Sequence, residues 1–159
     1  MLAAIALAVA ITISPATDQT NTVGWQASAY TGKWYAEKWA PIRKCIMDRE
    51  SNFNYRAKNP RSSAMGAYQF LDSKWRVSLT HMMIHEASSV SERQAIKELR
   101  EKPIAKWSRY WQDRAFYTAF RHGKGKHHWK TTEGGTECIS LKVNKPTNYR
   151  SGMTFARMR

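Results

Sequence analysis

Glu50 stands where a short helix is expected to end, and this position suits an acid catalyst. Pro41 fits the first turn of that helix because its missing N–H needs no partner there, and Ile42 and Ile46 follow at helical spacing. Glu50 shares the face of these isoleucines in the last turn, where an apolar wall and the negative end of the helix dipole both disfavour ionisation. A carboxyl group that keeps its proton near neutral pH can protonate a glycosidic oxygen. The alternative is a surface glutamate that merely ends a helix.

The loop that follows this helix carries residue types that suit a carbohydrate ligand. Gly66 has no Cβ, so a sugar chain or a neighbouring backbone can approach it closely. Gln69 offers donors and an acceptor to an N-acetyl group or a hydroxyl. Tyr68 and Trp75 have flat faces with polar ends, as stacking on sugars requires. The alternative is that Tyr68, Phe70 and Trp75 are core aromatics. These residues predict a glycan-binding loop beside the acid.

The order of these residues resembles that of the soluble lytic transglycosylase and goose-type lysozyme superfamily, including its resuscitation-promoting-factor-like and phage relatives. In that family a Glu-Ser pair ends a helix, and an Ala-x-Gly-x-x-Gln loop and then an aromatic residue follow. The corresponding residues here are Glu50-Ser51, the run from Ala64 through Gly66 to Gln69, and Trp75. A weaker match, which looks like the late helix that closes the cleft, consists of Gln112, Ala115, Gly123 and Trp129. The usual Gly-Leu-Met-Gln is Gly-Ala-Tyr-Gln in this chain, and residues 131–159 match no part of the pattern.

The resemblance implies a mainly α fold of the lysozyme-like α+β superfamily, a compact helical domain with a substrate cleft and little or no sheet. It implies that one glutamate, Glu50, protonates the leaving oxygen and then helps the muramyl 6-hydroxyl close a 1,6-anhydro ring, without a cofactor. The expected function is therefore lytic transglycosylase cleavage of the MurNAc-GlcNAc bond of peptidoglycan. A hydrolytic lysozyme of the same fold is the alternative, with Asp72 or Glu86 as a possible second carboxylate. The expected substrate-binding residues are Ser51, Ser63, Gly66, Tyr68, Gln69, Trp75 and Gln112.

The chain divides into four segments by composition. Residues 1–16 are apolar and predict a signal peptide or anchor, although no early lysine or arginine precedes them; a virion arm and a buried first helix are alternatives. Residues 17–33 predict a polar linker, residues 34–130 the transglycosylase domain, and residues 131–159 a basic C-terminal extension. The expected location is extracytoplasmic, either secreted or periplasmic, or in a phage virion.

Further helices are expected after the loop. Ser91 and Gln94 form a capping-box pattern for one of them, and Pro103 opens a longer one that ends at Gly123. A single strand is indicated by alternating apolar residues, namely Ile139, Leu141 and Val143.

The net charge of +14 in 159 residues favours an anionic partner, although the basic tail could also be only a solvated end. Peptidoglycan strands and anionic wall polymers would attract such a surface, and nucleic acid would serve the same charge. A second class of hypothesis is therefore a basic virion or nucleic-acid-binding protein with an inactive lysozyme-like core, nucleic acid being the less favoured partner. The apolar N-terminal segment or the basic tail could contact a virion or envelope partner. A glycan-binding module that does not cleave is a third hypothesis.

Two cysteines, Cys45 and Cys138, lie far apart and lack a Cys-x-x-Cys spacing. Export would allow them to form a disulfide, and free buried thiols are the alternative. His81 and His85 have the i, i+4 spacing of zinc ligands, but Glu86 follows them instead of lying between them. No metal site is therefore expected.

Overall fold

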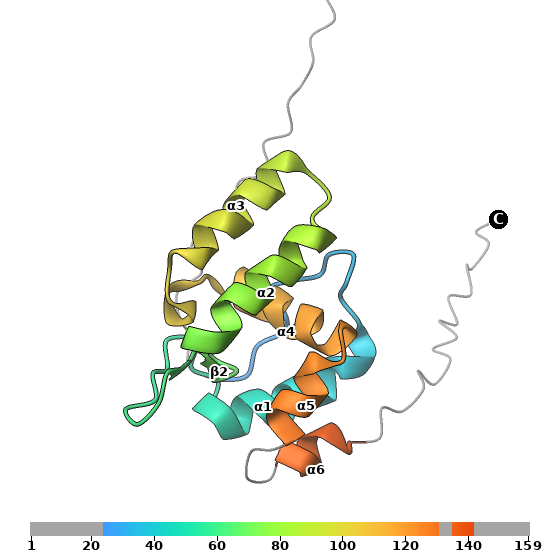
Figure 1. Cartoon of the computed structure of the whole chain (residues 1–159). Helices are drawn as coiled ribbons and strands as arrows, with labels where there is room; N and C mark the ends of the chain where they lie inside the picture. Colours follow the sequence, from blue (N-terminus) through green and yellow to red (C-terminus); the bar gives the residue numbers. More distant parts are fainter. Residues whose placement is uncertain (1–23, 131–134, 142–159) are drawn as a thin grey trace, which may run out of the picture.

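Short helices make up most of the described chain. The computed structural model describes residues 24–130 and 135–141, so the apolar segment 1–16, the first part of the linker and most of the C-terminal extension lie outside it (Figure 1). The prediction of a mainly α fold with little sheet is confirmed at this level. In chain order the elements are η1 (Glu37–Trp39), α1 (Ala40–Ser51), β1 (Ala64–Met65), β2 (Phe70–Leu71), α2 (Asp72–Glu86), α3 (Val90–Arg100), η2 (Ile104–Lys106), α4 (Arg109–Arg121), α5 (Lys124–Lys130) and α6 (Gly135–Ile139).

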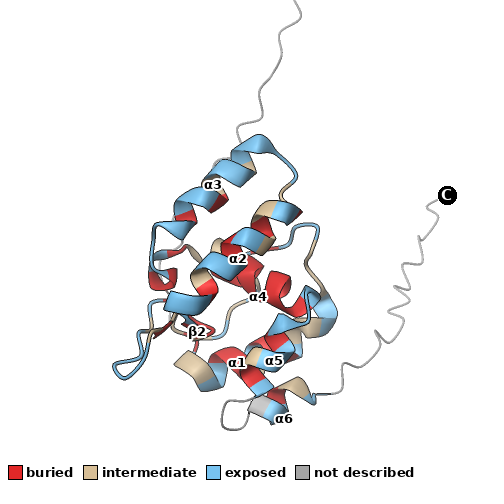
Figure 2. Cartoon of the chain, in the orientation of Figure 1, coloured by how far each residue is buried: buried red, intermediate tan, exposed pale blue. Residues whose placement is uncertain are grey.

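Helix α4 lies at the centre of the core. Every residue from Gln112 to Phe120 is buried, as the red segments in Figure 2 show. Helix α2 packs against α3 and α4, and α5 packs against α4 and α6 (Figure 1). Because α4 also carries Gln112, Asp113 and Arg114 into the interior, their polar atoms need protein partners there.

Helix α1 has the predicted bounds. Pro41 lies in its first turn, and Asn52 caps its C-terminus in the left-handed conformation with φ 50°. Phe53 is also left-handed, with φ 62°, and its N–H donates to the carbonyl of Met47 at 3.1 Å. A positive φ is common for asparagine and rare for a bulky aromatic residue, so the surrounding contacts fix this turn tightly. The chain therefore leaves α1 sharply, directly after Glu50 and Ser51.

Strands β1 and β2 form a short antiparallel hairpin. Ala64 pairs with Leu71, and Met65 pairs with Phe70, so residues 66–69 form the hairpin loop. An isolated bridge joins Lys58 to Met65 and holds the segment after α1 against the hairpin. The loop with the Gly-Ala-Tyr-Gln sequence is thus anchored at both ends.

The cap of α3 differs from the predicted one. The Ser89 side chain accepts a hydrogen bond from the Glu92 N–H at 3.1 Å, and the Glu92 carboxylate accepts one from the Ser88 N–H at 2.6 Å. The predicted capping box of Ser91 and Gln94 is therefore wrong by two residues. Ser89 is the cap because Glu92 then occupies the third helical position, where its carboxylate can bond back to the backbone and is stabilised by the positive end of the helix dipole.

Pro103 does not open one long helix, as predicted. It precedes the single turn of η2, and Trp107 is extended with ψ 144°, so α4 begins separately at Arg109. The indole N–H of Trp107 donates to the carbonyls of Leu99 and Lys102 at 3.0 and 2.9 Å. The helix is interrupted here, and the Trp107 side chain satisfies carbonyl groups at and just after the end of α3. Gly123, with φ 72°, follows the end of α4, as predicted.

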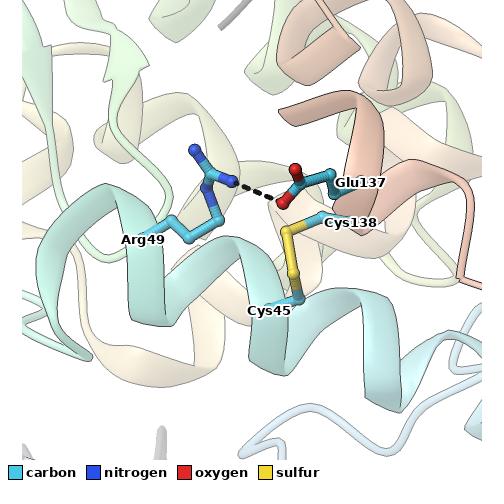
Figure 3. Close-up of a disulfide and its surroundings, with 4 residues drawn as sticks. All are labelled: Cys45, Arg49, Glu137 and Cys138. Atoms are coloured by element: carbon cyan, nitrogen blue, oxygen red, sulfur yellow. Dashed lines mark ion pairs between the residues drawn. A yellow bond between two sulfur atoms is a disulfide. The ribbon is translucent and has the colours of Figure 1, made fainter. Parts of the chain in front are cut away.

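Helix α6 replaces the predicted strand at Ile139, and Val143 lies outside the described residues. A disulfide joins Cys45 of α1 to Cys138 of α6, with a Cα–Cα distance of 5.5 Å and a sequence separation of 93 (Figure 3). Arg49 and Glu137 form a surface ion pair at 3.8 Å beside it. A strand would need a neighbouring strand, whereas here α6 is bound covalently to α1. Closing a long loop in this way contributes roughly 2–5 kcal/mol to stability.

Candidate functional site

Glu50 lies in the last turn of α1, at the border between the core and solvent. Its side chain is half-buried, while Ile46 and Met47 in the preceding turn are fully buried. The predicted setting of an acid beside an apolar helix face is therefore present in the fold. A carboxyl group at such a border is accessible to a ligand from one side.

Ser51 joins the end of α1 to the hairpin loop. Its hydroxyl donates to the carbonyl of Ala67 at 2.8 Å and accepts a hydrogen bond from the Asn54 N–H at 3.1 Å. The two halves of the sequence motif, Glu50-Ser51 and the Gly-Ala-Tyr-Gln loop, are therefore in direct contact. The Ser51 side chain makes this contact and is half-buried.

Gly66 and Gln112 fit together in the interior. Gly66 has φ 77°, and a Cβ at this position would lie 2.4 Å from Oε1 of Gln112. Gln112 Oε1 accepts from the Ala67 N–H at 3.0 Å, and its amide donates to the carbonyls of Tyr55 and Trp107 at 2.9 and 3.0 Å. Gln112 is fully buried and holds the loop, so its predicted contact with substrate is corrected to a supporting role.

We expect Gly66→Ala to lower the free energy of unfolding by roughly 1–3 kcal/mol, because the added methyl group meets Gln112 and the backbone is left-handed. Gly123→Ala is a matched control, since Gly123 has φ 72° with no atom within 4 Å of an added Cβ. Urea denaturation of both variants measures the difference. Equal losses in the two variants would contradict the close fit between Gly66 and Gln112.

Tyr68 is fully buried, so the predicted stacking of its ring on a sugar is corrected. Its hydroxyl donates to the Asp113 carboxylate at 2.5 Å and accepts from Nε of Arg43 at 2.7 Å. Burial, more than any other influence, raises the pKa of this phenol well above its ordinary value. Tyr68 therefore remains a neutral donor and fixes the loop to the core.

A buried ion pair accompanies Tyr68. Arg43 of α1 and Asp113 of α4 are joined by Nη2–Oδ1 at 2.9 Å, and both are at most 1% exposed. The Asp113 carboxylate also accepts from the Tyr55 hydroxyl and the Ala29 N–H, each at 2.7 Å. Each carboxylate oxygen thus has a partner, as a buried charge requires. No local sequence pattern predicts this pair, although Arg43 follows Ile42 on the buried side of α1 and a largely apolar run, residues 115–120, begins two residues after Asp113.

Trp75 is buried and packs in an aromatic cluster. Its ring centroid lies 5.6 Å from that of Phe70 and 4.8 Å from that of His128. The core alternative for Trp75 is the one that the structure supports. His128 also stacks on Phe70 at 5.6 Å with an interplanar angle of 19° and hydrogen-bonds to the backbone of Gln69. This cluster supports the hairpin loop from the side of α5.

We expect His128 to titrate with a midpoint near pH 4, because burial lowers its pKa from 6.5 to about 4. Between these two pKa values the unfolded chain binds more protons at this histidine than the folded chain does. The contribution of His128 to the free energy of unfolding is therefore complete above pH 6.5 and is lost as the pH falls toward 4. An NMR titration of the imidazole Cε1–H signals measures the midpoint. His128→Phe keeps the stacking and should weaken the pH dependence of urea denaturation, whereas the exposed-site control His81→Gln should retain it. An NMR midpoint above pH 6 would contradict the desolvation of the half-buried His128 ring.

Gln69 and Ser63 are the remaining predicted contacts, and both are half-buried. Gln69 has φ 48°, and its side-chain amide donates to the carbonyl of Gly66 at 3.0 Å. The Ser63 hydroxyl lies 2.9 Å from that of Ser73, and its carbonyl accepts from the Asp72 N–H at 2.8 Å. Both residues border the loop on its accessible side, so they remain candidates for substrate contact.

The acidic side chains considered as second carboxylates are engaged elsewhere. Asp72 is buried and accepts from the Ile104 N–H at 2.8 Å. Glu86 is buried and accepts from the Thr118 hydroxyl at 2.7 Å and from Arg121 at 2.9 Å. Both carboxylates therefore stabilise contacts between helices.

The histidine and acidic side chains of the described residues do not form a metal site. Within 24–130 and 135–141, no group of three or more histidine, cysteine, aspartate or glutamate side chains is placed to hold an ion. His81 and His85 pack edge to face at 4.6 Å between ring centroids. Over the same ranges no helix combines the length and the apolar character needed to cross a bilayer.

Comparison of the sequence with models of protein families and with curated proteins, and comparison with solved structures, found no match. The lysozyme-like interpretation therefore depends on the motif and on the contacts described above.

Proposed function

We propose that this protein is a lytic transglycosylase that cleaves the MurNAc-GlcNAc bond of peptidoglycan, with Glu50 as its single acid and base. The observation that carries the proposal is the hydrogen bond from the Ser51 hydroxyl to the Ala67 carbonyl at 2.8 Å. It joins the helix end with the acid to the loop with Gly66 and Gln69, the two parts that resemble the superfamily motif. The compact helical fold is compatible with this superfamily, and the glycan strand is proposed to lie along the side of the loop where Glu50 is exposed.

The engagement of Asp72 and Glu86 favours the transglycosylase over the lysozyme alternative. Hydrolysis by two carboxylates requires a second group across the scissile bond from the acid. Asp72 and Glu86 are buried and hydrogen-bonded at helix contacts, so neither is positioned for that role. A single glutamate is sufficient when the second nucleophile comes from the substrate.

In the proposed reaction, the Glu50 carboxyl group donates its proton to the glycosidic oxygen as the bond from that oxygen to C1 of the muramyl residue breaks. The muramyl 6-hydroxyl then bonds to C1, with assistance from the substrate's own N-acetyl group. The hydroxyl proton passes to the Glu50 carboxylate, which restores the acid. No water is consumed, and the products are a free sugar hydroxyl and a 1,6-anhydro end.

The disulfide supports an extracytoplasmic location or a place in a virion. Structural disulfides persist in oxidising compartments and on virion surfaces and are rare in the reducing cytosol. The Cys45–Cys138 disulfide joins two helices of the domain itself, so it would stabilise the fold in a compartment that keeps it oxidised. Peptidoglycan is present in the same compartment.

Release of soluble fragments from purified peptidoglycan tests the proposal. The folded, disulfide-bonded protein should lower the turbidity of a sacculus suspension and release soluble muropeptides. Retention of the protein on intact sacculi without release would overturn catalysis in favour of a glycan-binding module. Binding of DNA together with no release would instead support the basic nucleic-acid-binding protein.

A further inference from the structure

The surface between α5 and α6 is hollowed. A hollow of about 430 Å³ opens there, within the size range of small-ligand sites. One of its walls is α6, which the disulfide joins to α1 (Figure 3). Its described lining includes none of the residues proposed for glycan cleavage. Its lining consists of Gly123, Lys126, His127, Lys130, Thr136, Ile139 and Ser140.

Five of the seven described lining residues have side chains with a polar hydrogen, and none of these seven residues carries a carboxylate. Lys126 and Lys130 are one turn apart on α5, so their ammonium groups can converge on one ligand. His127 adds an imidazole N–H, and Ser140 adds a hydroxyl from α6. Acidic side chains are also absent from the whole stretch 121–130.

The other side of the hollow is held in place by local contacts. The Thr136 hydroxyl donates to the carbonyl of Lys130 at 3.2 Å, which joins the beginning of α6 to the end of α5. The nearby Glu137 is 86% exposed and pairs with Arg49 at 3.8 Å, so its carboxylate faces α1 and does not line the hollow. The ammonium groups of Lys126 and Lys130 are thus not neutralised from α6 by this glutamate.

We propose that this hollow binds a phosphate group of an anionic, phosphate-bearing cell-wall polymer. Two lysines, a histidine and the Ser140 hydroxyl form a donor set that matches the oxygens of a phosphodiester. Single-stranded nucleic acid would also need several aromatic faces for its bases, and the described part of the lining offers one ring, the imidazole of His127, since Trp129 of α5 is fully buried. The choice of a wall polymer over other phosphate carriers depends on the proposed peptidoglycan substrate.

This site would act separately from Glu50. A basic hollow that holds the wall polymer raises the local concentration of the enzyme on its substrate without taking part in bond cleavage. It also gives part of the large positive charge a specific partner.

Direct binding of poly(glycerol phosphate) to the full-length, disulfide-bonded protein tests the proposal. Calorimetry at about 0.15 M salt, where long-range charge effects are screened, compares the parent with the double variant Lys126→Gln/Lys130→Gln. The double variant Lys97→Gln/Lys102→Gln is the control, because it removes the same charge from exposed positions, one on α3 and one two residues after its end, that do not line the hollow. We expect at least a tenfold loss of affinity in the first variant and less than about a twofold change in the second.

Equal losses in the two double variants would overturn the site, because they would indicate diffuse attraction alone. Tighter binding of single-stranded DNA with the same number of phosphates, lost in the Lys126→Gln/Lys130→Gln variant, would overturn the wall polymer as the ligand. The probe has no glycosidic bond, so its binding is independent of cleavage. Binding by a protein that releases no muropeptides would contradict only the proposed function, and muropeptide release without binding would contradict only this site.

Discussion

Glu50→Gln is expected to lower the rate of muropeptide release by roughly 10²–10⁴-fold while the protein remains folded. Glutamine has nearly the same shape as glutamate, but its amide cannot donate the proton that the leaving oxygen requires. The half-buried position of Glu50 at the end of α1 allows such a replacement without a cavity. Release of soluble fragments from purified peptidoglycan at equal protein concentration measures the effect, and the thermal unfolding midpoint reports on the fold.

Glu98→Gln is the matched control for this experiment. Glu98 is exposed on α3, at the end of the molecule opposite α1 and α6 (Figures 1 and 2), and the change removes the same charge. Its activity should equal that of the parent. A Glu50→Gln protein that releases fragments as fast as the control would show that Glu50 is not the acid.

Asp113→Asn is expected to lower the free energy of unfolding by about 3–5 kcal/mol, the usual effect of breaking a buried ion pair. The change leaves the Arg43 cation without a counter-charge at a site that is at most 1% exposed. It also turns an amide N–H toward a donor, since Asp113 accepts from the Ala29 N–H, from Arg43 and from the hydroxyls of Tyr55 and Tyr68. Urea denaturation measures the loss.

The exposed Asp48 of α1 provides the comparison for Asp113. Asp48→Asn removes an equal charge from the surface of the same protein and should alter stability by less than about 0.5 kcal/mol. A loss below about 1 kcal/mol for Asp113→Asn would mean that the Arg43–Asp113 pair is not closed off from water. Because Tyr68 connects this pair to the hairpin loop, a large loss of stability should be accompanied by weaker catalysis.

Local signals were sufficient to predict α1 and the end of α4. Pro41 and the residues after Glu50 carry strong backbone preferences, and Gly123 can adopt the left-handed conformation that ends a helix. The cap of α3 was misplaced because two overlapping serine patterns compete, and only the contacts of Ser89 and Glu92 decide between them. The break at Trp107 depends on an indole that reaches the end of α3, which no short pattern contains.

The sequence was sufficient to predict the motif residues of the candidate site, but not the buried hydrogen bonds that hold the loop in place. Glu50, Ser51 and Gly66 were identified from residue type and order, and the structure brings their segments together. The roles of Tyr68 and Gln112 depend on partners far away in sequence: Asp113 is 45 residues from Tyr68, and Tyr55 is 57 residues from Gln112. Tyrosine and glutamine suit a glycan and a buried hydrogen-bond network equally well, so only the packing distinguishes these roles.

The most direct test of the proposed function is mass spectrometry of the soluble products released from purified peptidoglycan, with the Glu50→Gln protein treated in parallel. A lytic transglycosylase that uses Glu50 should release muropeptides that end in 1,6-anhydromuramic acid, and the variant should release almost none. Muropeptides with reducing ends would contradict this reaction and would mean that water, directed by a second group, completes the cleavage.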